Sequence, residues 1–121
     1  MEKPVVTDLL LRQGATFLQT LQLKGSSGSP IDWTGYKGRM QIRPSAASST
    51  VLATLTTENG GITVDGTSVT LFIDAADTAL LDFATAAYDV EMYLTDYYGA
   101  NKPFVYRAWQ GTITNSKEVT R

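Results

Sequence analysis

The sequence predicts an all-β protein, an antiparallel β-sandwich of about seven or eight strands with one short crossover helix near residues 75–82. Apolar residues alternate with polar ones in most of the apolar runs, which is the period of a strand with one buried face. Turn-forming residues separate these runs at intervals of roughly 8–12 residues, as in sandwiches and barrels. Because the 121 residues are about the length of one domain, we expect a single sandwich over residues 9–121. Residues 1–8 are expected to form an N-terminal arm that reaches a neighbouring subunit.

Composition removes several classes of function. Ten basic and twelve acidic residues give a net charge of −2, and Lys and Arg are nowhere dense enough to follow a phosphate backbone. The chain has no cysteine and no histidine, so it lacks thiolate nucleophiles, the commonest general base and the commonest transition-metal ligand. Its N-terminus does not have the pattern of a signal peptide, and no apolar stretch approaches the ~20 residues that span a membrane. We therefore expect no cofactor, no nucleic-acid or membrane partner, and a protein made in a cytosol.

The first long strand is expected at "TFLQTLQL", where Phe17, Leu21 and Leu23 share one face. After a loop rich in Gly and Ser, "GRMQIR" places Met40 and Ile42 inward and its basic and polar residues outward. Both runs show the alternation of antiparallel strands with one solvated face.

A hairpin is the clearest local signal in the chain. The stretch "ENGGITVDGTSVTLFI" contains a turn at 59–61, followed by two short alternating runs on either side of Asp65-Gly66. Asp-Gly suits a type I′ turn, whose central residues both need positive φ. The next predicted strand is "YDVEMYLT". The inward residues of the two strands "VTLFID" and "YDVEMYLT" are expected to be Val69, Leu71, Ile73, Tyr88, Val90, Met92 and Leu94.

The segment "DAADTALLDF" is the one predicted helix. Asp74 or Asp77 can cap its N-terminus. Its apolar residues at roughly helical spacing are Ala76, Leu80, Leu81 and Phe83. The helix covers at most about two or three turns, so we expect it to cross from one sheet to the other.

Aromatic residues gather in the last hairpin of the chain. They are Tyr93, Tyr97, Tyr98, Tyr106 and Trp109, with Arg107 beside them. Alternation leaves two possible core faces in the last strand, one that includes Tyr106 and one that includes Trp109, and we expect Trp109 to be buried. Tyr97 and Tyr98 lie at the turn and are expected to be exposed, where they favour an interface over an active site.

Carboxylates are the candidates for chemistry. Asp89 and Glu91 lie on one strand face about 7 Å apart, because a strand rises ~3.3–3.4 Å per residue, and an inverting glycosidase separates its acid and base by a similar distance. Their alternation with apolar residues fits a solvated strand face better. Asp74, Asp77 and Asp82 lack the spacing of a calcium loop, and helix capping explains the first two. We predict no catalytic, cofactor-binding or metal-binding residues and no enzyme activity.

Several motifs together resemble a known family. In order they are "LRQGATFLQTLQL", "PIDWTGYKGRMQIRP", "GGITVDGTSVTLFIDAADTALLDFATAAYDVEMYL" and "WQGTITNSKEVTR". They resemble small virion proteins of tailed bacteriophages, Ig-like β-sandwich modules similar to the N-terminal domain of baseplate upper proteins, which attach receptor-binding fibres to a tail. The resemblance extends from about Leu9 to Arg121, and it depends on the order and spacing of motifs that are individually weak.

The resemblance places "IDWTGYKGRMQIR" at a corner before a core strand. Gly35 can take the positive φ of a tight turn, Tyr36 can cover the sandwich edge, and Met40 and Ile42 enter the core. Trp33 departs from the Leu expected at its position, so it is interpreted as an extra aromatic presented to a neighbour.

The resemblance implies a structural role without catalysis, in a virion assembled in the cytoplasm of a host bacterium. The expected partners are other tail, baseplate or head proteins, bound as an adaptor, bridging or decoration module, with the chain a homo-oligomer or present in many copies. The predicted interface residues are Trp33, Tyr36, Tyr93, Tyr97, Tyr98 and Arg107. The alternative is a carbohydrate-binding module that adheres to cell-surface glycans through Tyr93, Tyr97, Tyr98 and Trp109, which a planar row of exposed aromatics would support.

Overall fold

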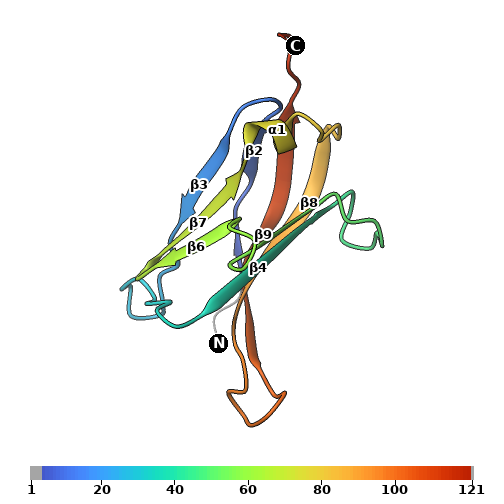
Figure 1. The fold of residues 1–121 in the computed structure, drawn as a ribbon. Helices are drawn as coiled ribbons and strands as arrows, with labels where there is room; N and C mark the ends of the chain where they lie inside the picture. Colours follow the sequence, from blue (N-terminus) through green and yellow to red (C-terminus); the bar gives the residue numbers. More distant parts are fainter. Residues whose placement is uncertain (1–3, 121) are drawn as a thin grey trace.

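A computed structural model describes residues 4–120 and confirms the all-β class: two sheets form two layers, with a single short helix among the described residues (Figure 1). The strands are β1 (Val5–Val6), β2 (Leu9–Arg12), β3 (Phe17–Leu21), β4 (Lys37–Arg43), β5 (Ala53–Thr56), β6 (Ile62–Asp65), β7 (Ser68–Ile73), β8 (Thr85–Leu94) and β9 (Phe104–Ser116), and the helix is α1 (Ala75–Thr78). One sheet has six strands in the order β1-β9-β8-β4-β5, with β2 also paired to β9. The other has three strands in the order β3-β7-β6.

The core lies between the two sheets and confirms the predicted inward faces. All the inward residues predicted in the strands are buried except Leu94, which lies half-buried at the end of β8. The buried set is Phe17, Leu21, Leu23, Met40, Ile42, Val69, Leu71, Ile73, Tyr88, Val90 and Met92. Burial of one face of each strand is therefore the main interaction that joins the layers.

The N-terminal segment differs from the predicted arm. Val5–Val6 pairs in parallel with β9 of the same chain, and β2 continues in the same register, so the described part of residues 1–8 is bound to its own sheet. Residues 1–3 lie outside the described residues. The two short strands β1 and β2 also raise the number of strands to nine, above the predicted seven or eight.

The break between β1 and β2 falls at Thr7 and Asp8. The Thr112 amide donates to the Asp8 carboxylate over 3.1 Å, and the Tyr88 hydroxyl donates to the Thr7 carbonyl. Gly111 lies directly against that carbonyl, and an added Cβ would collide with it. A glycine is therefore required where the break between β1 and β2 lies against β9.

The predicted hairpin is present, but its turn is one residue further along. Asp65 pairs with Ser68, so Gly66 and Thr67 form the two-residue loop. Gly66 has a φ of 59° while Asp65 and Thr67 do not have positive φ, and a glycine at the first central position is what a type II′ turn requires.

The predicted helix is shorter than expected and consists of a single turn. Asp74 caps it, accepting a hydrogen bond from the Ala76 amide over 3.4 Å. Beyond the turn, the Gln13 side chain donates to the Leu81 carbonyl over 3.0 Å, so this carbonyl is held by another segment of the chain. Leu80 is 80% exposed, because the segment leaves the helix before that side chain can turn toward the core.

A β-bulge in β9 resolves which of its faces is buried. Val90 pairs with Trp109 and Glu91 pairs with Arg107, so Ala108 is an extra residue. The bulge shifts the alternation by one position, and both Ala108 and Trp109 are buried, as is Tyr106 before them. The expected burial of Trp109 is confirmed, and each of the two predicted faces of β9 provides part of the core.

The outer edge of β5 is closed by one side chain. The amide of Thr56 donates to the Asn59 side-chain carbonyl over 2.9 Å, and the Asn59 side-chain NH2 donates to the Thr54 carbonyl over 3.0 Å. The Gly61 amide also donates to that Asn59 oxygen, over 2.8 Å. Asn59 therefore occupies the position of a neighbouring strand and blocks further pairing.

Candidate interaction surface

The β8–β9 hairpin extends beyond the sandwich and carries the most exposed tyrosines of the described chain (Figure 1). Tyr97 is 58% exposed and Tyr98 is 66% exposed. We call residues 95–103 the hairpin tip. It confirms the prediction that these tyrosines lie exposed at a turn.

Hydrogen bonds within the tip hold its shape. The Asn101 amide donates to the Asp96 carboxylate over 2.7 Å, and the Tyr98 amide donates to the Lys102 carbonyl over 2.9 Å. Asp96 and Asn101 have φ values of 57° and 61°, in the left-handed region that Asp and Asn tolerate better than most residues. The tip is therefore an ordered loop with two aromatic rings on its surface.

Aromatic contacts connect the tip to the sandwich. The ring centroids of Tyr97 and Tyr98 are 4.8 Å apart at an interplanar angle of 86°. Tyr97 contacts Phe104 at 5.5 Å, and Phe104 contacts Tyr36 at 6.4 Å. Tyr36 is half-buried, and burial, followed by the charge of Tyr97, raises the pKa of its hydroxyl. Tyr36 thus supports the tip from the side of the sandwich, through Phe104. The sequence did not predict this contact, because it joins segments far apart in the chain.

Trp33 does not lie on the interaction surface, so its assignment to the interface is wrong. It is 1% exposed and its ring contacts Tyr36 at 5.1 Å and Trp109 at 6.0 Å. The expected corner is confirmed, because Gly35 has a φ of 88°. The Trp33 amide donates to the Gly66 carbonyl over 2.8 Å, and this bond holds the corner over the open end of the sandwich. The indole fills that end of the core.

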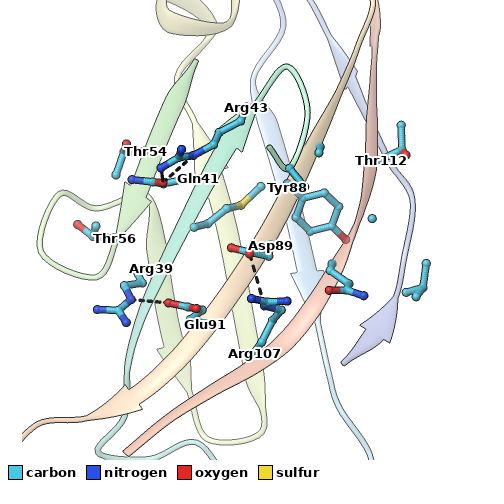
Figure 2. Close-up of a pocket in the computed structure, with 16 residues that line it drawn as sticks. Arg39, Gln41, Arg43, Thr54, Thr56, Tyr88, Asp89, Glu91, Arg107 and Thr112 are labelled. Carbon is cyan, nitrogen blue, oxygen red and sulfur yellow. Dashed lines mark hydrogen bonds and ion pairs between the residues drawn. The ribbon is translucent and has the colours of Figure 1, made fainter. Parts of the chain in front are cut away.

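The outer face of the six-stranded sheet is a second, charged surface (Figure 2). It is hollowed into an open pocket of about 870 Å³. We define the charged face by six lining residues: Arg39, Gln41, Arg43, Asp89, Glu91 and Arg107. Its polar and charged side chains belong to the residues of β4, β8 and β9 that point outward, away from the core.

Charges on this face are paired across strands. Arg39 bonds to Glu91 over 2.7 Å and Arg107 approaches Asp89 at 3.5 Å, as Figure 2 shows. The guanidinium of Arg39 also lies 4.7 Å from the centroid of the Tyr93 ring. Tyr93 is therefore half-buried beneath an arginine, whereas Arg107 is exposed.

The predicted carboxylate pair belongs to this ion-pair network. Burial, and then the negative charge of Glu91, raise the pKa of the Asp89 carboxyl, while the neighbouring arginines lower it. Sequence alternation placed both carboxylates on one solvated face but missed the arginines opposite them, because cross-strand register decides which side chains meet.

The aspartates considered as a calcium site have separate roles. Asp74 caps α1, and Asp82 forms an ion pair with Lys117 at 2.6 Å. Among residues 4–120 no group of three or more metal-ligating side chains is arranged to hold a metal ion.

Neither the protein-family models nor the curated proteins compared with this chain match it. In the part of the chain that the structure describes, no helix has the length and apolar character needed to cross a membrane. Function is therefore argued from the tip and the charged face.

Proposed function

We propose that this chain is a non-enzymatic structural module that binds other proteins of a bacteriophage virion through its hairpin tip. The observation that carries the proposal is the pair of exposed tyrosines, Tyr97 and Tyr98, on an ordered loop that extends away from the sandwich. Tyrosine is enriched in protein interfaces and in their energetic centres. A loop already held in shape also loses less conformational entropy when it binds.

The kind of partner is proposed from the family resemblance. The sandwich fold agrees with the Ig-like module that the motifs resemble. Tail, baseplate or head proteins are accordingly the proposed partners, with the chain acting as an adaptor, bridging or decoration module in many copies.

Glycan binding is the other candidate, and the aromatic geometry does not favour it. Tyr97 and Tyr98 are nearly perpendicular, at 86°, Arg39 covers one side of Tyr93, and Trp109 is buried. These residues therefore form no planar row on which sugar rings could stack.

The test is site-specific photocrosslinking in particles of a phage that encodes the chain. A photoreactive phenylalanine replaces Tyr98, and the control replaces Leu80, which is 80% exposed beside α1, at the other end of the molecule (Figure 1). We expect position 98, and not position 80, to crosslink to another virion protein identified by mass spectrometry. Absence of the chain from purified particles, or equal crosslinking at both positions, would refute the proposal. A glycan array with the purified chain tests the alternative.

A further inference from the structure

We infer that two copies of this chain pair through strand β3, which forms an antiparallel twofold contact with β3 of a second copy. The inference goes beyond the proposed function, because it concerns a strand edge away from the tip (Figure 1). Within residues 4–120, β3 pairs only with β7, so its other edge is open.

The hydrogen-bonding groups at this edge follow from the register. The Phe72 amide donates to the Gly61 carbonyl over 2.8 Å, so the backbone groups of Phe72 face β6. Alternation along an antiparallel strand then turns those of Leu71 toward β3, where Gln19 is its partner. The N–H and C=O groups of Leu18 and Thr20 consequently point away from β7, toward the open edge.

These outward groups match those of a second copy. If two β3 strands run antiparallel about Gln19, then Leu18 of each copy faces Thr20 of the other, and such a pair exchanges hydrogen bonds in both directions. Leu18 is 66% exposed, and the contact would shield its side chain. The Gln19 side chain lies beside this edge, where it donates to the Thr20 carbonyl over a long 3.4 Å, and a second strand can displace it.

The other sheet edges have features that hinder pairing with a further strand, and β3 lacks them. Asn59 caps β5, β1 is only two residues long, and β2 and β6 end in Arg12 and Asp65. Strand β3, "FLQTL", contains no charge, proline or glycine. Natural sheets use such features to prevent pairing between molecules, so their absence from one edge marks it as an assembly surface. The match between the outward groups of Leu18 and Thr20 about Gln19 favours a second copy as the occupant, and no like charges meet in this register.

Disulfide trapping tests the register directly, because the chain has no cysteine. In the Gln19→Cys variant the two thiols would lie opposite each other at the twofold axis, within the ~4.4–6.8 Å Cα separation that a disulfide allows. The matched control is Leu18→Cys, whose position is more exposed but is offset from its own copy. Under mild oxidant we expect Gln19→Cys to form a disulfide-linked dimer at least about tenfold faster than Leu18→Cys. Equal rates, or faster crosslinking of Leu18→Cys, would overturn the register.

Light scattering of the full chain over a concentration series tests the dimer itself. The mass should rise from 13.1 kDa toward twice that value. Thr20→Pro removes an N–H that points away from β7. By symmetry it removes two intermolecular bonds, so the dissociation constant should rise about tenfold. Thr20→Val keeps the N–H and should dimerise like the unmodified chain. A single-chain mass at every concentration, with no preferential crosslinking of Gln19→Cys, would overturn the inference and leave the proposed role of the tip intact.

Discussion

Replacing Asn59 with alanine tests how the β5 edge is stabilised. The substitution removes three side-chain hydrogen bonds, from the Thr56 and Gly61 amides and to the Thr54 carbonyl. Each such bond contributes about 0.5–1.5 kcal/mol net, and the exposed position of Asn59 favours the lower part of that range. We expect Asn59→Ala to lower the free energy of unfolding by roughly 2 kcal/mol.

Thermal and urea unfolding followed by circular dichroism measure this loss. With an unfolding entropy of about 2.1 cal/mol/K per residue over 121 residues, a loss of about 2 kcal/mol lowers Tm by about 8 °C. Asn59→Asp retains the acceptor oxygen for the Thr56 and Gly61 amides, but it places a second oxygen against the Thr54 carbonyl. Because a carboxylate accepts these two bonds more strongly than an amide oxygen, its loss at neutral pH should be smaller than that of Asn59→Ala. A loss below about 0.5 kcal/mol for Asn59→Ala, the low limit for a single bond, would refute the idea that this side chain closes the edge. Freed groups at Thr54 and Thr56 should also make the variant aggregate faster when it is concentrated.

Two further predictions concern the contact of the N-terminal segment with β9 and the charged face. Gly111→Ala should push the Thr7 carbonyl away and lower the free energy of unfolding by about 2 kcal/mol or more. It should also remove hydrogen-exchange protection from the amides of β1 and β2. Unchanged protection would contradict the close contact. The pKa of Asp89 is raised from 3.8 by burial and by Glu91, so the folded state binds this proton more tightly than the unfolded state. The stability that protonated Asp89 contributes to the folded state is complete below the unfolded pKa of this carboxyl, and it is lost as the pH rises through the folded pKa. Asp89→Asn should therefore match the unmodified chain near pH 3, below the ordinary value of 3.8, and gain relative stability in urea unfolding as the pH rises through the folded pKa. The opposite slope would refute this reasoning.

The class of fold and most of the core could be predicted from the sequence alone. Strand alternation is a local property, since successive side chains point to opposite faces whatever the partner strand is. For that reason "GRMQIR" placed Met40 and Ile42 inward correctly. The positive φ of Gly35 and the exposure of Tyr97 and Tyr98 could be predicted for the same reason, because turn chemistry is also local.

Features that depend on contacts between distant segments could not be predicted in this way. The bulge at Ala108 brings Trp109 into the core, and Trp33 is buried because its corner closes over that indole. Parallel pairing with β9 binds the segment that was expected to be a free arm. Which sheet edge is open depends on the register of β3 with β7 and on the position of Asn59 beside β5. Register and closure arise from the whole set of pairings, and no local pattern in the sequence encodes them.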